Sequence, residues 1–238
     1  MQLKEKFSKD PVKYAFEIYD MENESKYTEF IIHREGYLMF YRRFKHPNVI
    51  LEADEEETLT YLISKISESK YILFTDPKWL GVVREKIPNA KIYGEILMIC
   101  ENPKAFPDKR VRRLSSDDLE LTPYSGKRLE FLSEALSAGK TTVYGAFVDE
   151  RFVSVAYTWI ETESVAYIGG VLTEERYRNR GLAKAVVSAI ANDIVKRGKI
   201  ASLYVRDDNI PAIKAYEAVG FKARGRRLWV DVNTGESP

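Results

Sequence analysis

The chain has 238 residues with 37 basic and 36 acidic side chains, so its net charge is +1. This length allows one large or two small domains, and the balanced charge gives no whole-protein case for a nucleic-acid or membrane partner. No apolar stretch is long enough to cross a bilayer, residues 1–10 hold no apolar signal core, and the single Cys100 cannot form an internal disulfide. Together these features predict a cytoplasmic protein.

The first hundred residues alternate between helical and extended patterns. We expect helices over residues 10–19, 54–67 and 77–86, and strands over residues 27–32, 37–44, 71–74 and 92–100. The helix over 54–67 begins with the acidic run DEEE, which suits the positive end of a helix dipole. This alternation predicts a small α/β or α+β domain over residues 1–102.

Residues 103–108 show no periodicity and include two prolines, Pro103 and Pro107. A proline cannot donate a backbone hydrogen bond, so this stretch is typical of a linker and we place the domain boundary there. The second domain then covers residues 109–238, and every motif that carries chemistry lies in it.

In the second domain the patterns predict a mixed sheet flanked by helices. We expect strands over residues 111–114, 142–148, 152–160, 165–172, 200–205 and 221–230, and helices over residues 128–138, 182–194 and 210–219. The run from Ser115 to Asp118 supplies a helix cap and an acidic first turn after the first of these strands.

Small residues at the start of the long helix form the first motif. The run Arg178-Asn179-Arg180-Gly181-Leu182-Ala183 lies where a strand has ended and a helix begins. The first turn of a helix offers unpaired N–H groups and about half a positive charge. Because Gly181 and Ala183 have no large side chains to cover this backbone, it can hold a phosphate. The alternative is that Gly181 only supports a tight turn and that Arg178 and Arg180 are solvated charges.

A second motif follows one helix and one strand later. It consists of Asn209, Ala212, Tyr216 and the pair Gly220-Phe221. The residues and offsets of both motifs resemble those of the GCN5-related N-acetyltransferase family, whose acetyl-CoA signature is Arg or Gln, two residues, Gly, one residue, and Gly or Ala. The order β-α-α-β-β-β-α-β-α-β over residues 109–232 is similar to that family as well.

This resemblance implies that acetyl-CoA binds where the fourth and fifth strands of the second domain splay apart. The pantetheine arm would pair with strand backbone, since a splayed edge leaves N–H and C=O groups that need partners. The pyrophosphate would rest on the N–H groups of the loop, and Arg178 or Arg180 would add a charge-assisted contact. The implied cofactor-binding residues are Val171, Leu172, Thr173, Arg178, Asn179, Arg180, Gly181, Leu182, Ala183, Asn209 and Tyr216.

The residues before the loop depart from the family pattern. Relatives commonly carry prolines and a Glu before the Arg, and here the run Thr173-Glu174-Glu175-Arg176-Tyr177 takes their place. Cofactor binding is unaffected by this difference, but the class of acceptor cannot be carried over from the resemblance.

Tyr216 is the residue that we expect to take part in catalysis. When an amine attacks a thioester the leaving thiolate needs a proton, and a phenol within hydrogen-bond reach can supply it. The alternative is a helix tyrosine that fills core space. Asn209 also has a structural interpretation, because Asn two residues before Pro211 is an ordinary helix cap, and a cap can also be a cofactor neighbour.

The sequence does not identify the general base. An alkylammonium has a pKa of roughly 10, so a base or a chain of waters must remove its proton before attack. Glu161 and Glu163 near the turn before the fourth strand, and Tyr167 on that strand, are the candidates. For each of them the alternative is a solvated or packing role.

No metal site or covalent nucleophile is expected. His33 and His46 lie outside the motif-bearing half, and no His/Cys cluster has the spacing of metal ligands. No Ser-His-Asp arrangement is suggested, and Cys100 ends an apolar strand, where a buried thiol is expected. Direct transfer from thioester to amine is therefore favoured over a covalent acyl-enzyme.

Residues 1–102 resemble the degenerate partner domain of two-domain acetyltransferases, including those similar to the glycine N-acyltransferases. By this resemblance the first half would cover the acceptor side of the cleft. Its aromatic candidates, which could equally fill the core, are Tyr37, Phe40, Tyr41 and Trp79. The expected partner is a small-molecule or peptide amine, and a homodimer is left open.

The sequence thus predicts an acetyl-CoA-dependent N-acetyltransferase that acts by direct attack of a primary amine. The acceptor would be a small molecule, an amino acid, or a peptide or protein N-terminus. One alternative is a non-catalytic acetyl-CoA-binding regulatory module. Another is an acyltransferase for longer acyl groups.

Overall fold

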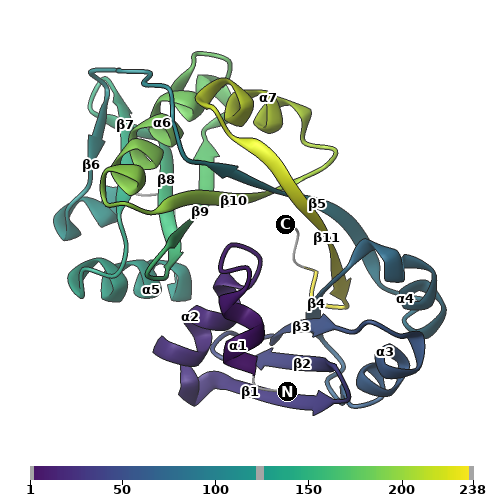
Figure 1. The fold of residues 1–238 in the computed structure, drawn as a ribbon. Helices are drawn as coiled ribbons and strands as arrows, with labels where there is room; N and C mark the ends of the chain where they lie inside the picture. The colour runs from purple at the N-terminus through teal and green to yellow at the C-terminus, as the bar shows by residue number, and fades with distance from the viewer. Residues whose placement is uncertain (1–2, 122–125, 236–238) are drawn as a thin grey trace. The chain divides into compact units, whose positions relative to one another are not determined.

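The computed structural model describes residues 3–121 and 126–235, which group into two compact units. The first unit comprises Met1–Leu97, Val205–Asn209 and Arg224–Pro238, and the second comprises Met98–Tyr204 and Ile210–Ala223. Figure 1 labels the elements of both units along the chain. Among the helices of the described residues, none is long and apolar enough to cross a membrane.

The first unit is a sheet covered by short helices. Its strands are β1 (Thr28–His33), β2 (Gly36–Tyr41), β3 (Asn48–Glu52), β4 (Tyr71–Thr75), the first part of β5 (Lys91–Cys100) and most of β11 (Lys222–Val232). Its helices are α1 (Leu3–Ser8), α2 (Ala15–Asn23), η1 (Ser25–Tyr27), α3 (Glu56–Ile63), η2 (Pro77–Trp79) and α4 (Leu80–Lys86). The strand order includes β1-β2-β3-β4-β11, in which only the β3–β4 pair is parallel.

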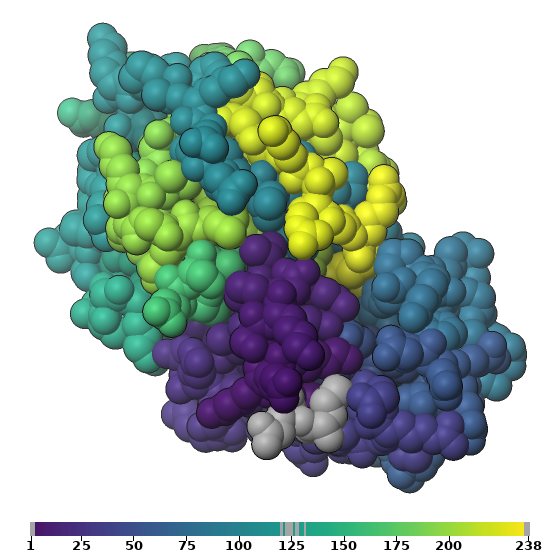
Figure 2. All heavy atoms as spheres, in the orientation of Figure 1, coloured from purple at the N-terminus to yellow at the C-terminus, as the bar shows by residue number. Residues whose placement is uncertain are grey.

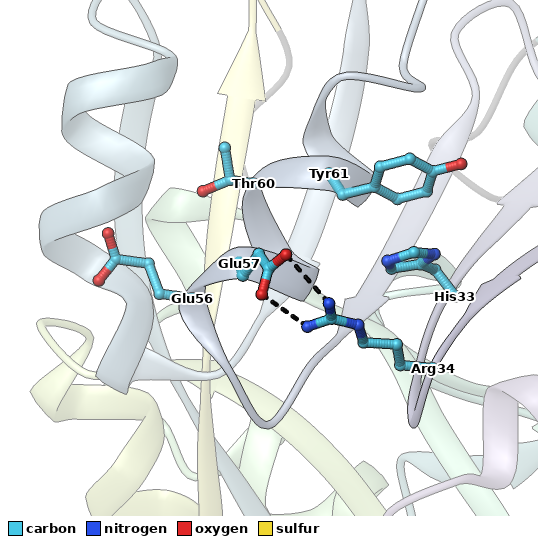
Figure 3. A pocket seen from close by; sticks show the side chains of 6 residues that line it. All are labelled: His33, Arg34, Glu56, Glu57, Thr60 and Tyr61. Atoms are coloured by element: carbon cyan, nitrogen blue, oxygen red, sulfur yellow. Dashed lines mark hydrogen bonds and ion pairs between the residues drawn. The ribbon is translucent and has the colours of Figure 1, made fainter.

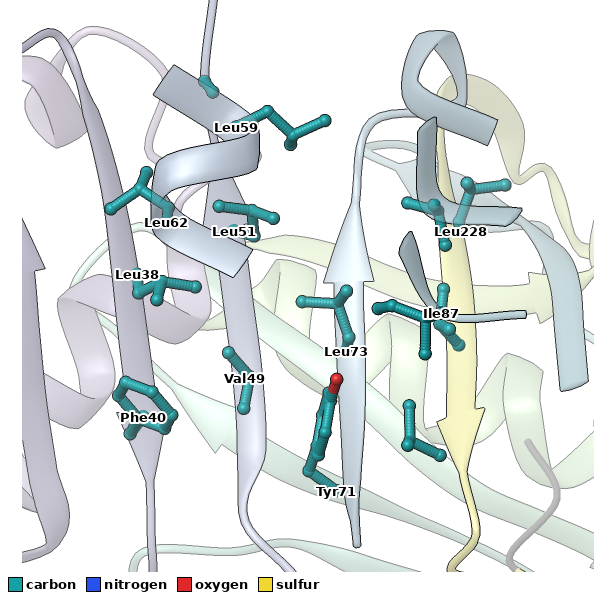
Figure 4. Close-up of a cluster of buried hydrophobic side chains, with 14 residues drawn as sticks. Leu38, Phe40, Val49, Leu51, Leu59, Leu62, Tyr71, Leu73, Ile87 and Leu228 are labelled. Carbon is teal, nitrogen blue, oxygen red and sulfur yellow. The ribbon is translucent and has the colours of Figure 1, made fainter. Parts of the chain in front are cut away.

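Strand β2 is buried over its whole length because both of its faces are covered. Successive side chains of a strand point to opposite faces. Leu38 and Phe40 therefore pack on one face in a cluster with α3 and α4 (Figure 4), and Tyr37 and Met39 pack on the other with α1 and α2. Helix α1 lies at the surface and turns Phe7 inward, and its purple atoms face the viewer in Figure 2.

The second unit holds the elements that carry the motifs. Its strands are β6 (Val111–Arg113), β7 (Val143–Val148), β8 (Arg151–Glu161), β9 (Val165–Thr173) and most of β10 (Ile200–Arg206). Its helices are η3 (Ser116–Leu121), α5 (Gly126–Ser137), η4 (Glu175–Tyr177), α6 (Leu182–Lys196) and α7 (Ile210–Val219). The strand order is β10-β9-β8-β7-β6, in which β10 and β9 are parallel and the other neighbours antiparallel.

These pairings confirm the predicted fold class, an α/β (α+β) protein with a mixed, mostly antiparallel sheet flanked by helices. Helix α6 packs against β7, β8 and β9, and Leu132 of α5 packs with Phe152 and Val155 of β8. The long helix that starts at Leu182 is thus held on the sheet directly after β9.

Three elements of the first unit differ from the sequence prediction. Helix α1 and strand β3 were not expected, and the first expected helix begins at Ala15 rather than at Asp10. Residues 11–14 form a turn instead, and Tyr14 is the N-cap of α2. The Tyr14 ring packs 5.0 Å from that of Phe7, and its hydroxyl donates a 2.7 Å hydrogen bond to Glu52. These are tertiary contacts, which the helical period of residues 10–19 does not contain.

The compact units are not continuous along the chain, unlike the predicted ranges 1–102 and 109–238. Strand β11 pairs with β4 from Leu228 to Val232, so the C-terminal strand groups with the first unit. Residues 103–108 are bonded within the second unit: the Lys104 N–H donates to the Val219 carbonyl at 2.7 Å, and the Ser188 hydroxyl donates to the Lys104 carbonyl at 2.8 Å. The predicted domain ranges stay a prediction.

Candidate functional site

Strands β9 and β10 begin side by side and then part. Their parallel register covers three residue pairs and ends at Ser202 opposite Tyr167. Beyond that point β9 continues to pair with β8 as far as Thr173. From residue 168 onward, β9 therefore pairs with β8 along one edge, and its other edge is no longer in register with β10. This geometry is the splay expected between the fourth and fifth strands of the second half.

A glycine pair lies just past the last paired position. Gly169 suits close packing, because a Cβ there would lie 3.2 Å from the Cβ of Trp159, a tight contact. Gly170 has a φ of +57°, a left-handed conformation that side chains disfavour. The β8–β9 register also shifts in this region, as expected for a β-bulge, which bends a strand and increases its twist. The two glycines thus shape the strand end that leads to the loop.

The loop from η4 to α6 changes direction through two left-handed residues. Asn179 has a φ of +61° and Gly181 a φ of +79°. The Nε of Arg178 donates a 3.2 Å hydrogen bond to the Thr173 carbonyl, which holds the loop against the end of β9. Backbone that alternates between right- and left-handed conformations can turn successive N–H groups toward one concavity, and such concavities bind anions.

The N-terminus of α6 has the features of a phosphate-binding site. Gly181 is the N-cap, no side chain caps the helix, and the first turn holds no acidic residue. The first N–H groups of a helix have no intrahelical acceptor, and the helix dipole adds partial positive charge. Arg178 and Arg180 are exposed beside them, and the Arg180 guanidinium stacks 5.3 Å from the Tyr177 ring centre.

Lys184, in the first turn of α6, is a cation that the sequence analysis did not select. Its Nζ lies 4.8 Å from the ring centre of Phe106. Its position three residues after Gly181 is the signal that could have identified it, because a cation in a first turn opposes the helix dipole unless an anion binds there.

Tyr216 is buried in α7, with 7% of its surface exposed. Burial raises the pKa of its phenol to about 12. Its carbonyl accepts hydrogen bonds from the N–H groups of Gly220 at 3.1 Å and Phe221 at 3.0 Å, and its ring lies 6.1 Å from that of Phe221. Gly220 has a φ of +115°, so this glycine ends the helix. The spacing from Tyr216 to Gly220-Phe221 therefore also has a structural cause.

Comparison with known proteins shows which proteins have a similar sequence or fold. Residues 143–230 match the family described as FR47-like protein, which is related to the GCN5-related N-acetyltransferases. A GCN5-related N-acetyltransferase-like protein from Streptococcus suis matches 87% of this chain over 89% of its own, with 13% identity and a TM-score of 0.63. The structure therefore has the fold of the GCN5-related N-acetyltransferases (GNAT).

Other solved structures share the GNAT fold over nearly the whole chain. A Drosophila protein matches 94% of this chain over 90% of its own, with 12% identity and a TM-score of 0.70. A tandem GNAT protein from the clavulanic acid biosynthesis pathway, solved without AcCoA, matches 88% over 85%, with 11% identity and a TM-score of 0.55. At these identities the likeness shows the fold. No curated protein sequence matches this chain.

The candidate bases lie at different places on the GNAT sheet. Glu161 is opposite Ala166, at the end where β9 and β10 still pair, and Glu163 is exposed in the turn at the same end. Burial opposes the ionised form of Glu161, but ion pairs with Arg197 and Lys199 lower the pKa of this carboxyl below its ordinary value. Both glutamates are thus remote from the splay.

Tyr167 is the candidate base that lies at the splay itself. It is the last β9 residue in register with β10, it is buried, and its ring stacks on that of Tyr204 at 5.5 Å. Asn209 directly precedes α7, where a helix cap is expected, and its N–H donates to the Arg206 carbonyl at 3.0 Å.

Two hollows are found among the described residues. One, on the first unit, is lined by His33, Arg34, Glu56, Glu57, Thr60 and Tyr61 (Figure 3). Its groups already interact: Arg34 forms two hydrogen bonds with Glu57 at 2.7 and 3.0 Å, and His33 stacks on Tyr61. In the described part of the chain no group of three His, Cys, Asp or Glu is arranged to hold a metal ion.

The second hollow, on the second unit, has a volume of about 80 Å³ and lies beside the far end of β9. Its lining is mostly apolar and comprises Leu121, Phe152, Val153, Ser154, Val155, Leu172 and Glu174. Leu172 belongs to the stretch of β9 that lies beyond the register with β10.

Proposed function

We propose that the protein is an acetyl-CoA-dependent N-acetyltransferase for a primary amine. The observation that carries this proposal is the continuous run from the splayed end of β9 to the open N-terminus of α6. The edge of β9 beyond its register with β10 offers backbone groups to the amides of pantetheine, and the loop with Asn179 and Gly181 in left-handed conformations offers N–H groups to the pyrophosphate. One donor molecule that contains both groups fits the two features together.

The residues proposed to hold the donor are those that the motifs select. Val171, Leu172 and Thr173 supply strand backbone, and the loop supplies N–H groups. Arg178 and Arg180 supply charge to the phosphates. The proposed set is completed by Asn179, Gly181, Leu182, Ala183, Asn209 and Tyr216.

In the proposed reaction the acceptor nitrogen attacks the carbonyl carbon of the thioester. The C–N bond forms, the C–S bond breaks, and the leaving thiolate takes the proton of the Tyr216 phenol. With a pKa of about 12 this phenol holds its proton at neutral pH and can act as the general acid. The acceptor ammonium loses two protons in total, of which one restores Tyr216 and the other passes to solvent.

The test of the function is release of free thiol from acetyl-CoA in the presence of amines, amino acids and peptides with free N-termini. We expect one class of amine to give release well above the hydrolysis background. Absence of release for every class would leave the proposal without support and favour a non-catalytic binding module. A larger rate with propionyl-CoA than with acetyl-CoA would instead favour an acyltransferase for longer acyl groups.

Replacing Tyr216 with Phe tests the role of the phenol. We expect Tyr216→Phe to lower kcat by about 10²-fold or more, since it removes a general acid, and to leave the Kd for acetyl-CoA within about twofold. Tyr61→Phe is the matched control, because Tyr61 is 39% exposed on the first unit and should keep full activity. An unchanged kcat for Tyr216→Phe in a folded variant would remove Tyr216 from the mechanism.

A further inference from the structure

Two tyrosines stack on each other at the point where β9 and β10 part. Tyr167 is the last β9 residue in register with β10 and lies opposite Ser202. Tyr204 follows Ser202 by two residues, so it lies just beyond the last paired position of β10. The ring centres of Tyr167 and Tyr204 are 5.5 Å apart with an angle of 25° between the planes, and both residues belong to the second unit. The stack therefore joins the two strands across the start of the splay.

Both rings lie on the same face of the sheet. Opposite residues of paired strands point to one face, and so do residues two apart on one strand. Tyr167, Ser202 and Tyr204 therefore share a face. The neighbouring side chains of Ile168 and Leu203 point to the other face and are only 4% and 1% exposed. Because Tyr204 is partly exposed, β10 is more open on the tyrosine face than on the other.

The next β9 position on the tyrosine face has no side chain. Gly169 follows Tyr167 by two residues, and Trp159 of β8 packs over it, since a Cβ on Gly169 would lie 3.2 Å from the Trp159 Cβ. Large aromatic side chains thus surround a short piece of bare strand backbone. Aromatic side chains in tight packing yield little to an additional group, so these residues bound the space at the start of the splay.

The proposed donor would turn its acyl group toward this stack. In acetyl-CoA the pyrophosphate and the thioester are at opposite ends of the pantetheine arm. The proposed phosphate site begins after Thr173, and the arm would follow the edge of β9 back toward Ile168. The thioester end would then lie nearest to the point where β9 and β10 begin to pair, which is where Tyr204 lies.

We propose that Tyr204 restricts the donor to short acyl groups. Its ring, held by the stack on Tyr167, occupies the place that acyl carbons beyond the acetyl group would take. Pairing of β9 with β10 closes the path in the plane of the sheet, and the buried Ile168 and Leu203 close the other face. This inference rests on the proposed function, from which it takes the position of the donor.

The direct test compares binding of acetyl-CoA and butyryl-CoA to the full chain by calorimetry, with no acceptor amine added. We expect the unmodified protein to bind acetyl-CoA about tenfold or more tightly, because two additional methylenes would meet the Tyr204 ring. Tyr204→Ala removes the ring and should change the ratio of the two Kd values by about tenfold or more in favour of butyryl-CoA. Equal affinities in the unmodified protein, or an unchanged ratio in folded Tyr204→Ala, would overturn the proposal.

Two further substitutions at Tyr204 separate the ring from the hydroxyl and guard against misfolding of the alanine variant. Tyr204→Leu keeps an apolar side chain on β10 without a ring and should shift the ratio in the same direction. Tyr204→Phe keeps the ring and should retain the ratio of the unmodified protein within about twofold. A shift in Tyr204→Phe as large as in Tyr204→Leu would contradict a role of ring size.

Tyr144→Ala is the matched control for lost packing. Tyr144 is also a partly exposed tyrosine of the second unit, and its strand β7 pairs with β6 and β8. We expect Tyr144→Ala to lower Tm and to leave the ratio of the two Kd values within about twofold. Equal shifts of the ratio in Tyr144→Ala and Tyr204→Ala would attribute the effect to general loosening of the sheet and refute the proposal.

Thiol release distinguishes a failure of this inference from a failure of the proposed function. With an accepted amine, Tyr204→Ala should raise kcat/KM for butyryl-CoA relative to that for acetyl-CoA by about tenfold or more. A shifted Kd ratio without thiol release for any amine would uphold donor selection by Tyr204 and contradict the proposed acetyl transfer. Failure of the unmodified protein to bind either acyl-CoA would overturn both.

Discussion

Glu17 titrates near neutral pH, unlike an ordinary carboxyl group. Burial is the main cause of this shift and raises its pKa from 4.5 to about 7, against the opposing effects of the Tyr37 hydrogen bond and the charge of Lys13. The negative charge of Glu52 acts in the same direction as burial. The sequence contains no sign of this, because an acidic residue at helical spacing is most simply interpreted as part of a solvated face.

The raised pKa of Glu17 predicts a pH-dependent stability. Between pH 4.5 and about 7 the native state retains a proton that the unfolded state has lost, so the free energy of unfolding falls as the pH rises through this window. The loss due to Glu17 is about 3 kcal/mol, and Asp20 acts with the same sign. We expect Glu17→Gln to unfold with a much flatter pH dependence in urea titrations at pH 5 and pH 8.

Glu22→Gln is the control for this measurement, since Glu22 is exposed on the same helix. It should keep the full pH dependence of the unmodified protein. Parallel curves for Glu17→Gln and the unmodified protein would show that Glu17 titrates like a solvated carboxyl group.

At the level of elements, the sequence predicts best where the signal is local. The order from β6 to β11 agrees with its prediction because each strand or helix there has its own period and its own turn residues. Strand β3 was not predicted from the sequence, because its five residues after Pro47 are too few to establish a period. Helix α1 was not predicted for the same reason, because only six residues form it. The packing of Phe7 in a buried cluster stabilises this short helix.

The two ends of α6 offer a matched test of the proposed phosphate site. Gly181 and Gly198 flank the helix with φ values of +79° and +78°, and a Cβ on either would meet no atom within 4 Å. Gly181→Ala and Gly198→Ala should therefore each lose about 1–2 kcal/mol of stability from backbone strain. Only Gly181→Ala should weaken acetyl-CoA binding, by about tenfold, because its methyl group lies beside the proposed phosphate-binding N–H groups.

Both variants are compared by urea unfolding and by equilibrium binding of acetyl-CoA. Equal weakening of binding in the two would attribute the effect to helix strain, and the loop would lose its proposed role.

At the scale of the whole molecule, strand β11 links distant parts of the chain. Leu228, Val230 and Val232 belong to the same buried cluster as Leu38 and Leu51, although they are far apart in the sequence. Each such side chain contributes roughly 1.5–3 kcal/mol on burial, so their sum approaches the total stability of a typical domain. The first unit therefore depends on residues from the C-terminus.

A fragment of residues 1–102 tests this dependence. We expect it to show no cooperative thermal unfolding by circular dichroism, because it lacks the β11 residues of its core. Joining residues 222–235 to its end through a flexible Gly/Ser linker should restore a cooperative transition. A cooperative transition in the fragment alone would show that β11 is dispensable for the first unit.

The sequence by itself predicted the fold class and the position of the loop from Arg178 to Ala183. These depend on local properties, namely strand and helix periods, left-handed glycines and short fixed offsets, which neighbouring residues encode. Only the tertiary structure decided that β11 completes the first unit and that Glu17, Asp20 and Glu24 are buried. Pairing and burial of this kind arise from contacts between segments far apart in the chain, and no local pattern specifies which segments will meet.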